Sequence, residues 1–337
     1  MRNTVFLAAA LAIAAGLAGA PARAADSAVV LTYNRFGEQR LPATNTRIDQ
    51  LDAHIAELTG GNYAVLPLPQ VVEALRAGRP LPDRAVALTL DDSATSVWEV
   101  AWPRLRAARL PFTLFVVTDE IDRAGGDRLG WDQLREMAAS GLATIGTKGA
   151  SHGHLPLMPA AAVAEDLARA RARLEAELGR APDLFAWPYG EMSREAAQAV
   201  RDAGFKAAFG QHSGPAWSKS DPWFLPRFPL NETYGEAERF RLAARSLPLP
   251  AVDITPDDPK LAANPPAFGF TLSPEVPGAE LLACYISHEG RAIIERLGPR
   301  IEVRMGKPLP QGRSRVNCTA PTLEGRWRWF GWQFLVE

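Results

Sequence analysis

Two acidic residues and two histidines in this sequence are of the types, and at the positions, that predict a metal site. Asp91 and Asp92 directly follow the apolar run AVALTL, and His152 and His154 lie in the later segment IGTKGASHGHL. Adjacent strand residues point to opposite sides, so one carboxylate of the pair can bind a cation while the other accepts a proton. Alone, the pair is equally typical of a helix N-cap, since a helical pattern begins just downstream.

The elements that position these residues alternate between short apolar runs and amphipathic helices. Buried strands are predicted at 28–34, 85–90, 112–117, 142–147, 184–188 and 206–210. Helices are predicted at 47–58, 96–109, 159–178 and 193–203, the last with Ser193 as its N-cap. This alternation predicts an α/β barrel or a doubly wound sheet, in which chemistry gathers on the loops after the strand carboxyl ends. The acidic pair, the histidine loop, the turn Pro188-Tyr189-Gly190 and the first strand exit share that position.

The C-terminal part of the sequence has a different pattern. Residues 246–267 are proline-rich and aperiodic, and we interpret them as a linker. Residues 268–337 contain short runs typical of antiparallel strands and predict a small all-β domain. Trp327 and Trp329 in its last run could stack on a sugar, although packing in a core is the stronger interpretation. Cys284 and Cys318 are predicted to form a disulfide worth roughly 3–4 kcal/mol, the alternative being two buried thiols.

The N-terminus and the overall charge bound the location and the partners. Residues 1–24 combine a basic start, an apolar run and an A-x-A site, which predicts a secretory signal. We therefore expect a secreted protein, in a bacterial periplasm, with no membrane span after signal cleavage. The 37 basic and 38 acidic residues leave a net charge of -1, which gives no electrostatic case for nucleic acid or an anionic membrane.

The stretch from residue 29 to about residue 227 resembles the polysaccharide deacetylase family, the NodB-homology domain of carbohydrate esterase family four. The resemblance lies in the order of three motifs: TLDD, then KGASH in place of an H-x-x-x-H motif, then PYG. It implies a distorted (β/α)7 barrel over residues 26–245. It also implies metal-dependent removal of acetyl groups from polysaccharide or oligosaccharide sugars, by a hydrolase of C–N bonds in linear amides.

The resemblance also assigns roles to individual residues. Asp91 matches the general base, Asp92 and His152 match ligands of a divalent metal, with Zn²⁺ expected, and Tyr189 matches the backbone N–H donor to the oxyanion. His212 is a candidate catalytic acid, or equally a structural loop histidine. The candidate substrate-binding residues are Asn34, Trp187 and Pro188. Asn34 follows Tyr33 where the family often has a histidine.

Lys148 departs from the family pattern, because it takes the place of the first metal-binding histidine, four residues before His152. An ammonium has no lone pair, so it can bind a metal only after losing its proton. Three arrangements are open: His154 replaces the missing ligand, Lys148 binds the metal as a neutral amine, or its ammonium pairs with Asp92. The third is favoured for the resting state, with the metal lost or weakly bound.

Two main hypotheses follow from these residues. The first is an exported polysaccharide deacetylase-type hydrolase that removes acetyl groups from N-acetylated sugars, with metal-activated water and Asp91 as base. The alternative is a catalytically impaired carbohydrate-binding paralogue in which Lys148 replaces the metal charge. A third interpretation, a metal-free esterase using Asp91 and His212, lacks a nucleophile, since Ser93 has no G-x-S-x-G context.

Overall fold

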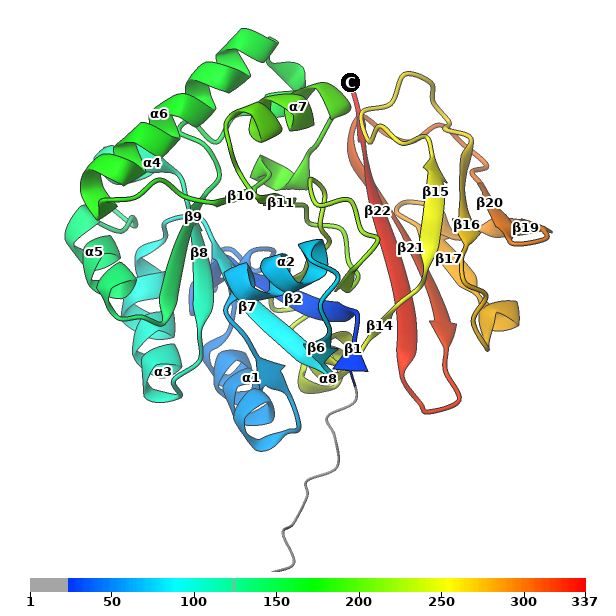
Figure 1. Ribbon diagram of the computed structural model, residues 1–337, viewed down its shortest axis with the longest axis horizontal. Helices are drawn as coiled ribbons and strands as arrows, with labels where there is room; N and C mark the ends of the chain where they lie inside the picture. The colour runs from blue at the N-terminus through cyan, green and yellow to red at the C-terminus, as the bar shows by residue number, and fades with distance from the viewer. Residues whose placement is uncertain (1–23, 124) are drawn as a thin grey trace, which may run out of the picture.

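The structure is a computed structural model that describes residues 24–123 and 125–337. The predicted signal segment lies outside these residues, apart from Ala24. Helices pack around a curled sheet in the first two thirds of the described chain, and a β sandwich forms the rest (Figure 1). Within the described residues, no helix combines the length and apolar character needed to cross a bilayer.

The main sheet has the parallel core that the apolar runs predict. Its order is β11-β10-β9-β8-β7-β2, and the strands are β2 (Ser27–Tyr33), β7 (Ala85–Asp91), β8 (Phe112–Val116), β9 (Ala143–Thr147), β10 (Leu184–Ala186) and β11 (Ala207–Phe209). Every residue of β2, β7 and β8 is buried, as in a parallel sheet covered on both faces. The sheet curls into a half-barrel, which confirms the α/β class and the distorted barrel.

Short strands complete this region. β12 (Ala216–Trp217) runs antiparallel to β2, whereas β13 (Phe228–Pro229) and β5 (Ala64–Val65) run parallel to β2 and β7. Two further pairs are β1 (Ala24–Ala25) with β6 (Leu81–Pro82), and β3 (Arg35–Phe36) with β4 (Asn45–Thr46). β13 matters most for the site, because it fixes the position of the residue just before it, Arg227.

The helices cover both faces of the sheet. They are α1 (Ile48–Gly60), α2 (Leu68–Arg76), α3 (Trp102–Ala107), α4 (Thr118–Asp122), α5 (Trp131–Ala139), α6 (Ala160–Leu178), α7 (Arg194–Asp202) and α8 (Ala237–Ala244). The four predicted helices are confirmed, with a π-helical turn at Val97–Ala101 before α3. Ser193 caps α7 as predicted, since its Oγ accepts the N–H of Ala196 at 3.1 Å. The other four helices were not predicted.

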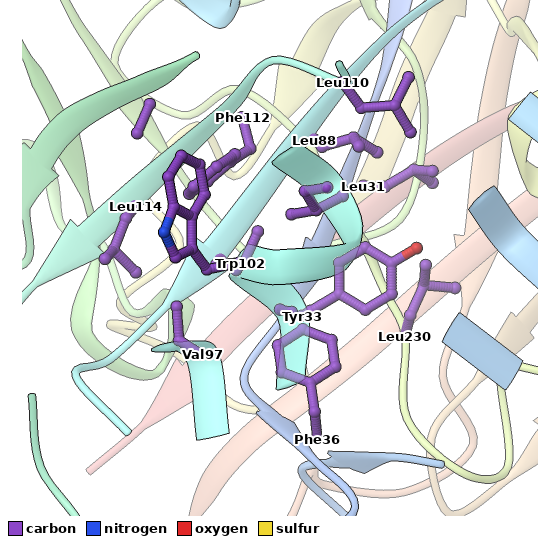
Figure 2. Close-up of a cluster of buried hydrophobic side chains, with 14 of the residues drawn as sticks. Leu31, Tyr33, Phe36, Leu88, Val97, Trp102, Leu110, Phe112, Leu114 and Leu230 are labelled. Carbon is purple, nitrogen blue, oxygen red and sulfur yellow. The ribbon is translucent and has the colours of Figure 1, made fainter. Parts of the chain in front are cut away.

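The hydrophobic core beneath the helices holds the strands in place. Figure 2 shows Leu31, Leu88 and Phe112 from neighbouring strands gathered with Trp102 of α3, whose ring centroid lies 6.0 Å from that of Phe112. Such cores are packed as densely as organic crystals. The loops at the carboxyl edge of the sheet therefore start from fixed positions.

The C-terminal region contains two largely antiparallel sheets. One has the order β14-β22-β21-β17-β18 and the other β15-β16-β20-β19. Their strands are β14 (Leu247–Pro248), β15 (Ala251–Thr255), β16 (Phe268–Leu272), β17 (Ala283–Ile286), β18 (Gly290–Arg291), β19 (Ile293–Leu297), β20 (Arg300–Arg304), β21 (Gly312–Pro321) and β22 (Trp327–Val336). The segment predicted as a linker thus contains β14 and β15, where proline is tolerated because these strands are sheet edges.

The β sandwich shares one hydrophobic cluster with the barrel. Phe185 and Trp187 of the barrel belong to the same cluster as Phe268, Trp332 and Phe334 of the sandwich. The predicted disulfide is confirmed, because Cys284 and Cys318 are bonded and lie opposite each other on β17 and β21. The two regions are therefore packed together rather than joined by a free tether.

The tryptophans of the last strand take different positions. Trp329 packs edge-on against Phe228, with ring centroids 5.2 Å apart, and its Nε1 donates to Asn317 at 3.0 Å. This placement agrees with the core interpretation for Trp329. Trp327 is 39% exposed and is the first residue of β22, next to the β21–β22 turn.

Candidate active site

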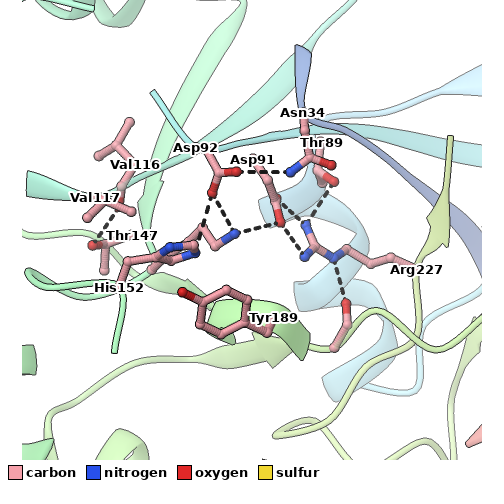
Figure 3. Close-up of polar contacts among 12 residues, drawn as sticks. Asn34, Thr89, Asp91, Asp92, Val116, Val117, Thr147, His152, Tyr189 and Arg227 are labelled. Carbon is pink, nitrogen blue, oxygen red and sulfur yellow. Dashed lines mark hydrogen bonds and ion pairs between the residues drawn. The ribbon is translucent and has the colours of Figure 1, made fainter. Parts of the chain in front are cut away.

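Polar residues from several loops meet at the carboxyl edge of the main sheet (Figure 3). Asp91 ends β7 and Asp92 follows it, Lys148 follows β9, and Asn34 follows β2. The short 3-10 turn Pro188–Gly190, after β10, brings Tyr189 to the same mouth. The structure therefore gathers these residues into one cluster, although the first and the last, Asn34 and Tyr189, lie more than 150 positions apart in the sequence.

Asp91 is fully buried and held by two cations. Arg227 donates two hydrogen bonds to it, Nη1 to Oδ1 at 2.6 Å and Nη2 to Oδ2 at 2.9 Å, and Lys148 Nζ lies 3.3 Å from Oδ2. Burial alone would raise the pKa of Asp91, but Arg227 and then Lys148 outweigh it and hold the pKa far below the usual range. Asp91 is thus a permanently ionised carboxylate, and a weaker base than the sequence suggested.

Asp92 forms the tightest contact with Lys148. The Lys148 Nζ donates to Asp92 Oδ1 at 2.7 Å, and Asn34 Nδ2 donates to Asp92 Oδ2 at 3.1 Å. Lys148 is 1% exposed. Burial lowers its pKa, but Asp91 and Asp92 outweigh this cost, so the pKa lies above the usual lysine value. The favoured ammonium–carboxylate arrangement is therefore the one that the structure contains.

His152 lies beside this pair without a hydrogen bond. Its Nε2 is buried, has no hydrogen-bond partner, and lies 3.6 Å from Asp92 Oδ1. Burial, with help from the Lys148 charge, lowers the pKa of His152 to about 4. The imidazole is therefore neutral near pH 7, with one nitrogen facing the acidic pair.

The loop that carries Lys148 and His152 is held by α6. Asp166 of α6 is buried and accepts the backbone N–H groups of Ala150 and Ser151, each at 2.9 Å. At Gly149, with φ +92°, an added Cβ would lie 2.3 Å from Asp166 Oδ2. Glycine is required there both for its conformation and for the close approach of the carboxylate.

Tyr189 stacks against the histidines of this loop. Its ring lies 4.3 Å from that of His154, nearly parallel, and 4.7 Å from that of His152. His154 Nδ1 lies 2.6 Å from the buried carboxylate of Glu191, so His154 is engaged away from Asp92. The structure therefore does not place His154 as the replacement ligand considered above.

Three residues of the site share an uncommon backbone conformation. Asp92, His152 and Tyr189 have φ values of +66°, +60° and +57°. Such left-handed positions cost roughly 1–3 kcal/mol each for residues other than glycine, and they cluster at functional sites. The surrounding contacts must hold these residues in place, which is independent support for a functional mouth here.

The residues at this mouth do not fit the divalent metal that the family implies. A metal ligand must offer a lone pair, and the position of the third ligand holds the Lys148 ammonium, 2.7 Å from Asp92. A cation at that point also repels a second cation. Among the described residues, no three His, Cys, Asp or Glu side chains are grouped to hold a metal ion. The site therefore lacks the third ligand that the expected Zn²⁺ ion would need.

Three other predicted site residues are buried. His212 is buried against Phe224, with ring centroids 4.2 Å apart, and burial followed by the charges of Arg315 and Arg227 lowers its pKa to about 3. This burial favours the alternative of a structural histidine, since an acid at this position would have to be protonated. Trp187 and Pro188 are also buried, and the Trp187 indole donates to the Trp223 carbonyl, so neither side chain is exposed to a substrate in this structure.

Arg227 is the main residue that sequence reasoning missed. Its side chain is 0% exposed and joins Asp91, Thr89 and the Gly210 carbonyl. The available signal was an arginine between apolar residues in FLPRFPL, where a buried charge needs an acidic partner. Nothing in the sequence pattern identified that partner as Asp91.

Comparisons with known proteins agree with this geometry. Residues 78–208, from just before β7 to β11, match the family profile described as polysaccharide deacetylase. This stretch of the chain is therefore similar to polysaccharide deacetylases. The matched region includes Asp91, Asp92, Lys148, His152 and Tyr189, whereas Asn34 and Arg227 lie outside it.

Two curated proteins to which this chain is similar share one name. Poly-β-1,6-N-acetyl-D-glucosamine N-deacetylase of Escherichia coli strain K12 is 28% identical over 212 residues, covering 51% of this chain and 32% of the relative. The protein of the same name from Staphylococcus aureus strain MSSA476 is 23% identical over 194 residues, covering 54% of this chain and 67% of the relative. The chain thus matches about a third of the first relative and two thirds of the second.

Solved structures show the same fold. IcaB from Ammonifex degensii is 25% identical with a TM-score of 0.59, and the match covers 66% of this chain and 98% of that one. The Streptococcus pyogenes deacetylase PplD matches with a TM-score of 0.60 at 19% identity, over 65% of this chain and 98% of that one. These matches show that the chain shares its fold with solved deacetylases.

Proposed function

We propose that this chain acts on N-acetylated glucosamine polymers as a polysaccharide deacetylase-type hydrolase. The observation that carries the proposal is the meeting of Asp91, Asp92, His152 and Tyr189 at one mouth of a deacetylase domain. The names of the curated relatives support the substrate class. In the reaction, water oxygen bonds to the acetyl carbon, the amide C–N bond breaks, and the sugar nitrogen leaves as an amine after gaining a proton.

The Lys148 ammonium can supply the positive charge that the carbonyl oxygen needs. Two of its three N–H groups are directed to Asp91 and Asp92, which leaves a third for the substrate oxygen. The backbone N–H of Tyr189 is the second donor to that oxygen in this proposal. Donors fixed in advance around a developing oxyanion are a large source of rate acceleration.

With a pKa of about 4, His152 is a weak base at neutral pH, so in this proposal it accepts a proton only where the charge of Asp92 stabilises the imidazolium. Its Nε2 has no hydrogen-bond partner and faces Asp92, which can stabilise the imidazolium once it forms. Asp91 stays ionised and orients Lys148 with the help of Arg227. We therefore propose that His152 takes the proton of the attacking water and passes it to the departing amine.

Acetate release from β-1,6-linked N-acetylglucosamine oligomers tests this function. We expect slow release whose rate stays within twofold after treatment with a chelator, and a loss of at least 100-fold in the variant Lys148→Met. Loss of activity with the chelator and its recovery with Zn²⁺ would contradict the role given to Lys148. The exposed Lys206, paired with Asp183 on the surface, provides the matched control variant Lys206→Met.

A second candidate function is carbohydrate binding without turnover. The observation that favours it is the Lys148–Asp92 contact, which satisfies the charges of the mouth before any substrate arrives. In this case the oligomers bind, measured by calorimetry, and no acetate appears with or without Zn²⁺. Recovery of metal binding and acetate release by Lys148→His would identify Lys148 as the residue that blocks hydrolysis.

We also propose that the protein works outside the cytoplasm, on envelope or exopolysaccharide sugars. The signal-like residues 1–24 and the Cys284–Cys318 disulfide support this location, because disulfides persist in oxidising compartments. Expression of the whole chain in a bacterium, followed by fractionation and N-terminal sequencing, tests it. A cytoplasmic product that retains Met1 would overturn the proposal.

A further inference from the structure

The β sandwich reaches into the candidate active site. Gln333 of β22 is 1% exposed, and its Nε2 donates to the carbonyl oxygens of Tyr189 at 3.2 Å and Gly190 at 2.9 Å. Arg313 of β21 donates from Nη1 to the same Tyr189 oxygen at 3.2 Å. Its guanidinium lies 5.5 Å from the centre of the Tyr189 ring. Two strands of the C-terminal region therefore hold one turn of the barrel.

This turn has a conformation that needs outside support. Tyr189 has φ 57° and ψ 6°, a left-handed conformation that a bulky side chain rarely adopts. The turn itself is closed by the N–H groups of Gly190 and Glu191, which donate to Trp187 at 2.9 Å and Pro188 at 3.0 Å. The carbonyl of Tyr189 is held from the other side by the two side chains of the β sandwich. Its N–H belongs to the preceding peptide unit and keeps its direction as long as the φ and ψ of Tyr189 are held.

Gln333 is itself held in a single orientation. Its Oε1 accepts a hydrogen bond from Arg315 Nε at 3.0 Å, so the amide nitrogen is the atom that faces the turn. The neighbouring residues Trp332 and Phe334 are buried in the cluster shared with the barrel. The strand is thus anchored without help from the Gln333 amide, and loss of that amide leaves β22 in place.

We propose that Gln333 and Arg313 are positioning residues, through which the C-terminal sheet holds the Tyr189 turn in its left-handed conformation. The inference rests on the proposed function, in which the Tyr189 N–H faces the acetyl carbonyl. It gives the β sandwich a role in the site that the deacetylase domain match, residues 78–208, does not include.

The first test measures the turn directly, by hydrogen–deuterium exchange of the whole chain. In Gln333→Met, which keeps the length of the side chain but has no donor, we expect the Gly190 and Glu191 amides to exchange at least tenfold faster. In Arg313→Met we expect a smaller increase in the exchange rate of these amides. In Arg313→Lys, which keeps a donor, the rate should stay within threefold of the wild-type rate. The matched control is Arg304→Met, since Arg304 is similarly exposed but lies on the far sheet against Glu295.

The second test uses acetate release and separates this inference from the proposed function. We expect kcat to fall at least tenfold in Gln333→Met while KM stays within twofold, because the donor is misdirected but the substrate still binds. Unchanged exchange of the turn amides in Gln333→Met overturns the inference, whatever the activity. Faster exchange together with a wild-type protein that releases no acetate supports the inference and contradicts the proposed function.

Discussion

Lys148 is the single residue that most strongly determines the chemistry of the mouth. Its ammonium is almost completely buried between Asp91 and Asp92, and Arg227 supplies the second cation. Two carboxylates and two cations then balance one another. Removal of one member of a buried set leaves the others unpaired in a region of low dielectric constant, which is costly.

Lys148→Met should therefore lower stability as well as change the site. The expected loss is about 3 kcal/mol of unfolding free energy, at the low end for a buried pair because the Asp92 side chain is 21% exposed. Denaturation by urea at pH 7 measures it. Lys206→Met removes an ion pair in which both side chains are exposed, and it should change the unfolding free energy by less than about 1 kcal/mol. Equal effects of the two variants would contradict the prediction.

Buried neutral histidines predict a loss of stability in mild acid. The pKa of His152 is lowered to about 4 and that of His212 to about 3, in both cases chiefly by burial. The unfolded chain binds protons near pH 6.5, before the folded chain does, so stability is complete above pH 6.5 and falls as the pH drops toward 4. We expect a loss on the order of 1–2 kcal/mol per histidine between pH 7 and pH 5.

Urea titrations at pH 7 and pH 5 check this dependence. The variant His212→Gln should show a smaller difference between the two pH values than the wild type. The exposed His288, in the turn between β17 and β18, serves as the control through His288→Gln. An identical pH difference in all three proteins would show that His212 does not titrate as a buried group.

Among the elements, the junction of α6 with the loop after β9 sets the position of Lys148 and His152. Gly149 lies in the left-handed region and against Asp166, while Gly179, at the end of α6, has φ +73° with open space around it. An alanine at Gly179 adds backbone strain only, and an alanine at Gly149 adds a collision with the carboxylate as well.

Gly149→Ala should therefore destabilise the protein more than Gly179→Ala. We expect about 1 kcal/mol for Gly179→Ala and roughly 2 kcal/mol more for Gly149→Ala. Chemical denaturation of both variants gives the difference, and the acetate assay shows whether the loop has moved. Equal losses would mean that Asp166 shifts freely, and that α6 does not position the site.

The elements near the site were largely predictable, because buried parallel strands leave continuous apolar runs. The six predicted strands and the four predicted helices lie within a few residues of their observed bounds. The pairing of Lys148 with Asp92 was predictable from charge and motif position. The contacts of Arg227, Asp166 and Gln333 were not, since each depends on tertiary packing between segments that share no local pattern.

The features that were not predicted also have physical explanations. The pattern of 246–267 gave no strand, because β14 and β15 are short edge strands formed by pairing with β22 and β16. The burial of Trp187 was not predicted, because its position next to the PYG turn indicated a substrate-binding side chain. Its indole instead joins the cluster that the barrel shares with the sandwich.

For the molecule as a whole, the shared cluster predicts that barrel and sandwich unfold together. Replacing Cys284 and Cys318 by alanine should lower stability by about 2–4 kcal/mol, since the disulfide closes 34 residues of the sandwich. Because the cluster spans both regions, tryptophan fluorescence and far-UV circular dichroism should still report a single transition. Two separate transitions would show that the barrel folds without the sandwich.

The hydrogen bond between Gln333 and Tyr189 joins residues 144 positions apart. Contacts of such long separation close large loops and form late, after local helices and neighbouring strands are in place. The parallel sheet can therefore assemble, and bring its acidic pair and lysine together, while the turn is still loose. During synthesis, the mouth would be finished only when β22 docks, so the site is completed together with the last strand of the sandwich.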